Sequence, residues 1–207
     1  MNKLAKLETK MAEHHSTPLS KNTQNMVFGV GDPNANLMLI GEAPGEQEDK
    51  VGEPFVGRAG KFLDALLERA GIQREEAYIT NTVKYRPPRN RTPTDHEANQ
   101  AKPYLDAQIT LVDPNAIVAV GQFASRRLTN IEASLQYLRK EWWPLELNQT
   151  IYPIRPVYHP GFLLRQNDKS NMKRLCQQVI EELQKAQAVA EGKNKATFQD
   201  ERTREVD

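Results

Sequence analysis

Cysteine is almost absent from this sequence, because Cys176 is the only one in 207 residues. A single thiol excludes an internal disulfide, and it excludes any metal or iron–sulfur site whose ligands are all cysteines of one chain. Cys176 occupies an apolar position in the helical pattern KRLCQQVIEEL. We therefore expect it to be a buried small hydrophobe and not a reactive thiol.

Long apolar runs and an excess of one charge are also missing. No stretch approaches the roughly 20 apolar residues that span a bilayer, and residues 1–15 lack the apolar centre of a secretory signal. We expect a soluble, cytoplasmic protein with no membrane partner. With 28 Lys and Arg against 27 Asp and Glu, the formal net charge is +1. That balance excludes a globally basic DNA-coating protein, but it allows a local basic patch.

The length suits one domain with a single core. No internal repeat is found, and the ends differ in composition from the middle. We divide the chain into a polar N-terminal segment at 1–25, a folded domain at 26–190 and a charged, flexible tail at 191–207.

Short apolar runs alternate with helical patterns inside the domain. Strands are predicted at residues 37–40, 78–80, 115–120 and 151–157. The last strand contains two prolines, which predict an irregular or edge strand. Helices are predicted at residues 59–70, with Gly71 as C-terminal cap, at 95–112, with Thr94 as N-cap and Glu97 completing a capping box, and at 169–190. The alternation predicts an α/β fold with a parallel sheet covered on both faces.

Unusual segments follow the predicted strands, at the end of a parallel sheet where ligands bind. The first is GEAPG at 41–45, whose glycines and proline make a tight turn with exposed backbone N–H groups. Such a turn can hold a carbonyl or an anion, and Glu42 would project into the same cleft. An ordinary strand-to-loop turn explains the segment equally well.

The segment GEPFVGRAGK at 52–61 looks like a phosphate-binding loop but is not one. No glycine lies five residues before Gly60, and Phe62 stands where a Walker A motif has Ser or Thr. Phe55 is an apolar residue among turn-forming residues. It is either part of the core or a platform on which a base stacks.

The loop NTVKYRPPRNR at 81–91 begins with an amide and continues with basic residues. The donor and acceptor of Asn81 can match the O4 and N3–H edge of uracil, which cytosine presents in reverse. A turn-forming asparagine is the alternative. Lys84, Arg86, Arg89 and Arg91 follow with no acid among them. They suit either a phosphate-contacting patch or a solvated loop.

The last segment is YHPGFLLR at 158–165, which places a histidine at a strand end before three large apolar residues and an arginine. Exposed apolar residues beside a cation suit a wedge that enters a DNA groove. A buried helix start is the alternative.

Taken in order, GEAPG, GEPFVGRAG, YITNTVKYRPPRNR and YHPGFLLR resemble the motifs of family-four uracil-DNA glycosylases, from about Met26 to about Arg165. The resemblance implies a three-layer α/β sandwich with a small central parallel four-stranded sheet flanked by helices. It also implies a monofunctional base-excision repair enzyme, which flips uracil or a related deaminated base out of DNA and hydrolyses the N-glycosidic bond. The implied partners are uracil-containing DNA and free uracil as product, and we expect a monomer.

The resemblance also implies a role for each matching residue. Glu42 positions the attacking water or stabilises the sugar cation, and His159 donates to uracil O2, so these two are the catalytic residues. The positions implied to bind substrate are Ala43, Glu48, Phe55 and Asn81. The positions assigned to DNA contact are Lys84, Arg86, Arg89, Arg91, Leu163 and Arg165.

One departure from the family pattern concerns a cofactor. Family-four enzymes usually carry a four-cysteine iron–sulfur cluster, and the matching positions here are His14, Thr17, Tyr85 and Ala101. We therefore expect no cluster, and the chemistry requires no other cofactor or metal. A zinc site is rejected because the spacing is poor and Ala101 offers no ligand. Our hypothesis is that Tyr85 and its neighbours fill the vacated space by apolar packing.

Two other functions remain open. The first alternative is a glycosylase-fold module that binds DNA or uracil without cleaving. The second is an enzyme that links covalently to the abasic sugar through a histidine in the basic loop. No histidine lies in residues 84–93, and His96 follows in the next predicted helix, which argues against the covalent route.

Overall fold

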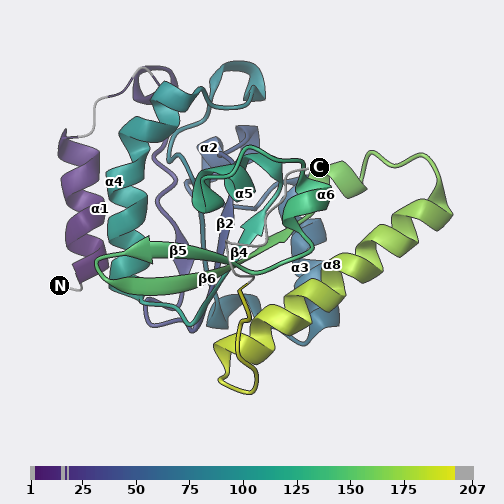
Figure 1. The fold of residues 1–207 in the computed structure, drawn as a ribbon. Coiled ribbons are helices and arrows are strands. Elements are labelled where there is room, and N and C mark those ends of the chain that lie inside the picture. Colours follow the sequence, from purple (N-terminus) through teal and green to yellow (C-terminus); the bar gives the residue numbers. More distant parts are fainter. Residues whose placement is uncertain (1–2, 15–16, 18, 199–207) are drawn as a thin grey trace.

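A computed structural model describes residues 3–14, 17 and 19–198 (Figure 1). Its centre is one six-stranded sheet in the order β1-β3-β2-β4-β6-β5. The four inner strands run parallel, as predicted, and the two outer strands are antiparallel to their neighbours. The strands are β1 (Val30–Gly31), β2 (Leu37–Gly41), β3 (Tyr78–Asn81), β4 (Ala116–Val120), β5 (Trp143–Leu147) and β6 (Thr150–Val157).

The prediction of a four-stranded sheet is corrected by these outer strands, and the prediction that 151–157 is irregular or at an edge is wrong. β6 lies inside the sheet, where Pro156 is paired with Ala119 of β4 and Pro153 with Pro144 of β5. A strand residue directs its N–H towards one neighbour only, so each proline removes at most one ladder bond. Eight residues of strand tolerate that loss when both faces are packed.

Helices cover both faces of the sheet, which confirms the three-layer arrangement. α1 (Lys3–His14) and α4 (Asp95–Val112) lie side by side on one face, and α3 (Arg58–Ala70) and α8 (Lys169–Ala190) lie on the other (Figure 1). The shorter helices are α2 (Glu46–Val51), α5 (Gln122–Thr129), α6 (Leu135–Leu138) and α7 (Pro160–Leu163). Single 3-10 turns are η1 (Ser20–Asn22), η2 (Arg74–Glu76) and η3 (Pro88–Asn90).

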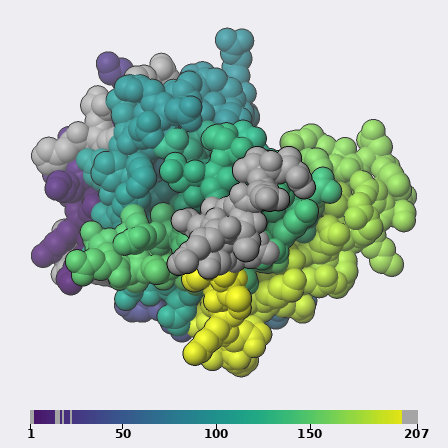
Figure 2. All heavy atoms as spheres, viewed as in Figure 1, coloured from purple at the N-terminus to yellow at the C-terminus, as the bar shows by residue number. Residues whose placement is uncertain are grey.

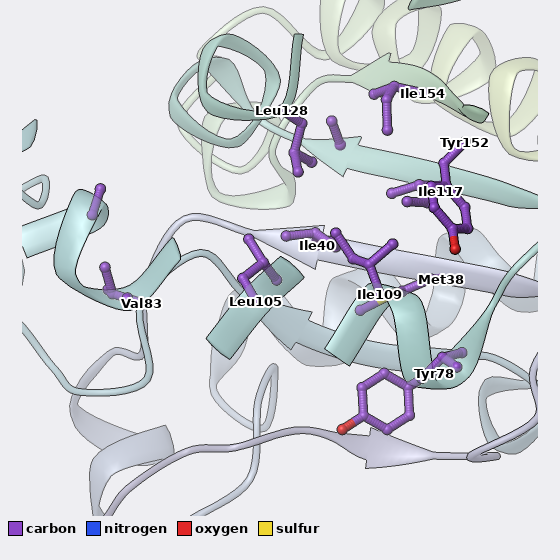
Figure 3. Close-up of a cluster of buried hydrophobic side chains, with 14 of the residues drawn as sticks. Met38, Ile40, Tyr78, Val83, Leu105, Ile109, Ile117, Leu128, Tyr152 and Ile154 are labelled. Atoms are coloured by element: carbon purple, nitrogen blue, oxygen red, sulfur yellow. The ribbon is translucent and has the colours of Figure 1, made fainter. Parts of the chain in front are cut away.

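Alternation along β2 divides the hydrophobic core into two halves. Met38 and Ile40 point to the α1/α4 face, where they pack with Ile109 of α4 (Figure 3). Leu37 and Leu39 point to the other face and pack with α3 and α8. Because successive strand residues face opposite sides, one apolar run supplies both halves. This burial on both faces fixes the register of β2, and with it the position of the loop that follows.

The helix ends agree with the predicted caps. Thr94 Oγ1 accepts from the Glu97 backbone N–H, and the Glu97 carboxylate accepts from the Thr94 N–H at 2.8 Å, so the capping box is confirmed. Gly71 ends α3 with a φ of 79°, a left-handed conformation that glycine adopts without a side-chain penalty. Cys176 is buried on α8 among apolar neighbours, as expected.

The polar N-terminal segment contains a helix that the sequence analysis missed. In α1, Leu4 and Met11 are buried against the core and Leu7 packs beside them. Their spacing of three and four residues forms a narrow apolar stripe in an otherwise charged helix. So few apolar residues give a weak periodic signal, and the helix is stable only because α4 covers the stripe.

The positions that match the cluster ligands of family-four enzymes are part of this packing. Thr17, Tyr85 and Ala101 are all buried, and the latter two share a core cluster with Met11 and Leu19. A phenol, a hydroxyl and a methyl group do not supply the thiolates that hold an iron–sulfur cluster. The residues present therefore do not fit that cofactor, and their burial supports the packing hypothesis. The side chain of His14 lies outside the described part of the chain.

The predicted charged tail is described only in part. After α8 the chain continues to Phe198, which forms an isolated parallel bridge with Trp142. Residues 199–207, the rest of the predicted tail, lie outside the described residues. No helix in the described ranges is both long and apolar enough to cross a membrane.

Replacing Met11 by Ala tests whether α1 is part of the folded domain. The side chain is fully buried, so the substitution should lower the free energy of unfolding by about 2–5 kcal/mol. Urea unfolding followed by far-UV circular dichroism measures this change. Lys6→Ala on the exposed face of the same helix is the control and should shift stability by less than about 0.5 kcal/mol. Equal effects of the two substitutions would mean that α1 does not stabilise the domain.

Candidate active site

A cleft of about 540 Å³ opens at the carboxyl ends of β2, β4 and β6. We call it the main cleft. Its walls come from the three loops that follow these strands, from the basic loop after β3 and from Leu135 of α6. The sequence analysis named the loops after β2, β3 and β6 but not the one after β4. The lining residues are Glu42, Ala43, Pro44, Gly45, Pro87, Asn90, Arg91, Thr92, Gly121, Gln122, Leu135, Tyr158, His159, Phe162 and Arg165.

Glu42 lies directly after β2 and is held in place through its backbone. Thr82 donates its hydroxyl to the Glu42 carbonyl at 2.5 Å, and the Thr82 N–H donates to Gly41 O at 2.9 Å. Burial raises the pKa of the Glu42 carboxyl above its usual value, and a hydrogen bond from the Thr92 side chain offsets part of that rise. The acid therefore sits in a partly desolvated wall of the main cleft, where a carboxylate interacts strongly with nearby positive charge.

His159 follows β6 and caps the short helix α7. Its Nδ1 accepts the backbone N–H of Gly161 at 3.0 Å, so in the neutral ring the proton resides on Nε2. Burial, and after it the positive charge of Arg165, lower the pKa of His159 to about 4, while the charge of Glu48 opposes the shift. The imidazole is therefore neutral near pH 7 and keeps Nε2–H as a hydrogen-bond donor.

Phe55 and Asn81 lie behind the cleft wall, beside the last residue of β2. The Phe55 ring centroid is 6.0 Å from that of His159. A Cβ placed on Gly41 would lie 2.4 Å from Asn81 Oδ1 and 2.5 Å from the Phe55 ring. The amide and the ring therefore converge on Gly41, next to Glu42. The four side chains predicted to form the pocket (residues 42, 55, 81 and 159) gather around one strand end.

The backbone at Phe55 is strained to achieve this placement. Its φ of 54° is in the left-handed region, which is unfavourable for a bulky residue. Gly60 of α3 packs so closely that a Cβ there would lie 1.8 Å from the Phe55 carbonyl oxygen. The glycine lets the start of α3 support the turn that carries the ring.

A family model, Uracil DNA glycosylase superfamily, matches residues 28–184. The chain belongs to this superfamily. It is 41% identical over 172 residues to the type-4 uracil-DNA glycosylase of Thermotoga maritima, covering 83% of this chain and 86% of that protein. It is also 41% identical over 166 residues to the type-4 enzyme of Pyrobaculum aerophilum, with 78% and 85% covered. The type-4 enzyme of Archaeoglobus fulgidus is 37% identical over 166 residues, with 76% and 83% covered.

In this member of the superfamily, Glu48 joins two loops and is not in the lining of the main cleft. One carboxylate oxygen accepts from the backbone N–H groups of Val56 (3.0 Å) and Gly57 (2.7 Å). The other accepts from the N–H of Gly45 at 3.1 Å. The side chain predicted to bind substrate thus ties the GEAPG turn to the loop that carries Phe55. This geometry indicates a positioning residue.

The assignment of Lys84 to DNA contact is wrong, because its side chain is fully buried. Its Nζ donates to Thr80 Oγ1 and to the Asn81 carbonyl, both at 2.6 Å, and burial lowers its pKa well below the usual value. The lysine thereby braces the end of β3 at Asn81. Sequence reasoning took it for a surface cation because the loop is rich in Arg and Pro.

The arginines of the basic loop differ in how far their charge is neutralised. Arg91 pairs through both terminal nitrogens with Glu97 and is the first cause of that carboxyl's pKa falling to about 2. Arg86 Nη2 lies 3.6 Å from Glu46 Oε2. Arg89 is exposed at the tip of η3, and no described carboxylate forms an ion pair with it. The basic loop contains no acidic residue, and the carboxylates that pair with its arginines come from Glu46 of α2 and Glu97 of α4.

The assignment of Leu163 to DNA contact is also wrong, because its side chain is fully buried on the core side of α7. It cannot enter DNA from this position. The neighbouring Phe162 is 38% exposed and, like Arg165, lines the main cleft. Because α7 is helical, Phe162 and Leu163 point in different directions, one to the surface and one to the core. The apolar run alone does not show which residue faces which side. Thr92, Gln122 and Tyr158 are further lining residues that sequence reasoning missed.

Replacing Glu48 by Gln tests the bridge between the two loops. An amide keeps one acceptor oxygen and presents an NH2 group to a backbone N–H, so at least one of the three hydrogen bonds is lost. We expect the free energy of unfolding to fall by about 1–3 kcal/mol. Glu53→Gln, on an exposed residue of the same loop, should leave it unchanged. Differential scanning calorimetry of both variants measures this, and matched melting temperatures would exclude the bridge.

Proposed function

We propose that this protein removes uracil from DNA by hydrolysing the N-glycosidic bond, as a monofunctional base-excision repair glycosylase that works as a monomer and releases free uracil. Membership of the superfamily and the similarity to proteins named type-4 uracil-DNA glycosylase support the proposal. The observation that carries it is the imidazole of His159, whose Nδ1 is occupied by Gly161 in a cleft that also contains Glu42.

Recognition begins when the base leaves the helix. A base inside a duplex is out of reach, and extruding it costs a few kcal/mol. The Phe55 ring offers a face for stacking, and the Asn81 amide offers adjacent donor and acceptor groups for the O4 and N3–H edge. Ala43 lines the main cleft beside Glu42.

Cleavage leaves negative charge on the base and positive charge on the sugar. The two proposed catalytic residues each stabilise one of these charges. As the C1′–N1 bond breaks, its electron pair leaves with the base, and negative charge develops on uracil O2, to which His159 Nε2–H donates. The sugar becomes an oxocarbenium-like cation, which the Glu42 carboxylate stabilises. Water then adds to C1′, and its proton passes to Glu42 and on to the released base. Each such group contributes about 3 kcal/mol when aimed at developing charge.

The surface around the cleft is suited to holding the strand. Arg89 and Arg165 are exposed cations beside the main cleft, and the charges of Arg86 and Arg91 are partly offset by their carboxylate partners. Phosphates fix the register of a nucleic acid, so these arginines position the substrate without reading sequence. Phe162 takes the wedge role that Leu163 cannot perform.

An oligonucleotide with one uracil tests the proposal. Wild-type protein followed by hot alkali should cut the strand at the uracil, in single- or double-stranded DNA. Glu42→Ala and His159→Ala should each slow single-turnover release by about 100-fold, the equivalent of about 3 kcal/mol. Glu75→Ala, on an exposed acid of η2, is the control and should react like wild type.

Different products separate this proposal from its alternatives. DNA binding without any abasic site would identify a binding module, and a slow-migrating protein–DNA band in a denaturing gel would identify the covalent route. Parallel substrates with hypoxanthine, xanthine and thymine define the substrate range. Unchanged cleavage in the Glu42/His159 double variant would contradict the catalytic assignment.

The pH dependence of kcat/KM should show one acid limb that belongs to Glu42. Its carboxylate form is active, and because its pKa is raised above 4.5, activity falls as pH drops through that raised pKa. The neutral form of His159 is active and persists down to about pH 4, so its loss comes at lower pH. Residual activity of Glu42→Gln should therefore be flat across the wild-type limb. A limb that persists in this variant and disappears in His159→Asn would reverse the assignment.

A further inference from the structure

A second cleft, of about 430 Å³, opens beside the main cleft between α6, α7 and the first turns of α8. We call it the side cleft. Tyr158 and Phe162 line both clefts. Their rings are stacked, with centroids 5.3 Å apart. The two clefts are therefore neighbours separated by one aromatic wall, and a polymer that occupies one can continue into the other.

The side cleft is lined by positive charge without negative charge. Its ionisable lining residues are Arg139, Lys140, Arg174 and the tyrosine of the wall, and no carboxylate is among the lining residues. Within the described ranges, none of the three cations forms an ion pair with a carboxylate. The chain as a whole has nearly equal numbers of acids and bases. An acid-free cluster of three cations is thus a local departure from that balance.

The geometry of the cations fits a nucleic-acid backbone. The Arg139 guanidinium lies over the Tyr158 ring, 3.9 Å from its centroid, and its buried Nε has no hydrogen-bond partner among the described atoms. Arg174 reaches Asn171 with one nitrogen at 2.8 Å, which leaves its other donors available. The remaining polar lining consists of amides. Cations that bind phosphates, beside aromatic faces on which bases stack, are how proteins hold single strands.

We propose that the side cleft binds the DNA strand that flanks the extruded nucleotide, with phosphates on Arg139, Lys140 and Arg174 and an unstacked base against Phe162. This inference rests on the proposed function and extends it from the damaged base to its neighbours. A strand that delivers a nucleotide into the main cleft leaves it in two directions. The basic loop at 86–91 lies along one wall, and the aromatic wall opens the other direction into the side cleft.

Binding of a uracil-free single-stranded oligonucleotide, measured by fluorescence anisotropy over a series of salt concentrations, tests this inference. The variant Lys140→Ala/Arg174→Ala removes two phosphate contacts, so the negative slope of log K against log salt should become shallower by about 1.4. Binding at 0.1 M salt should weaken by more than about tenfold. Lengthening the oligonucleotide past the cleft should improve binding by wild type and not by the variant.

The matched control is Lys3→Ala/Lys6→Ala, which removes the same charge from α1, on the other side of the sheet from α8 (Figure 1). In Figure 2 the purple atoms of α1 lie at the left, away from the yellow-green atoms of α8 at the right. Its slope should equal that of wild type. Equal slopes in the two double variants, both with wild-type melting temperatures, would overturn the side cleft as a strand site. If wild type releases no uracil and yet the slopes differ, the proposed function fails while the side cleft stands. If uracil is released and the slopes agree, only the side cleft fails.

Discussion

The arrangement of this site depends on the absence of a side chain at Gly41. Asn81 Oδ1 and the Phe55 ring both occupy the space that a Cβ would need at this position. Since Gly41 is the last residue of β2 and pairs with Asn81 in register, the close approach is set by the sheet itself. Glu42 follows on the next residue, and Phe55 brings His159 within ring contact. A methyl group here would push the Asn81 amide, the Phe55 ring or both away from Glu42.

Hydrogen bonds of buried and half-buried polar groups then fix the loops around that point. Glu48 joins the turn after β2 to the Phe55 loop, and Thr82 and Lys84 brace the ends of β2 and β3. Each of these groups would be costly to leave unpaired inside the protein, so each one specifies a single loop conformation. The strained backbone of Phe55 persists because its surroundings determine it from several sides. The site is therefore built largely before substrate arrives, which is what electrostatic stabilisation of charge in a transition state requires.

The inner strands and the long helices could be predicted because each has a local signal, and the motifs also singled out the four residues that gather near Gly41. Apolar runs marked β2 and β4, and a capping box marked α4. Side-chain direction in the loops could not be predicted, since it depends on contacts with distant elements. Lys84 points inward to meet Thr80, Leu163 faces the core while Phe162 faces solvent, and Arg91 meets Glu97 of α4. The helix α1 was missed because its apolar stripe is narrow and its stability comes from α4, not from its own residues.

The packing around Tyr85 determines what this corner of the protein needs in order to assemble. In the family-four pattern, cysteines at this corner hold an iron–sulfur cluster, whereas here Tyr85, Ala101 and Met11 are buried in one core cluster. A corner made of packed side chains assembles as the chain folds and needs no delivery of iron or sulfide. Oxidants that dismantle exposed clusters find no thiolate to attack there, since the sole cysteine lies on α8, on the opposite face of the sheet. The integrity of this corner therefore follows the docking of α1 and not the redox state of a metal centre.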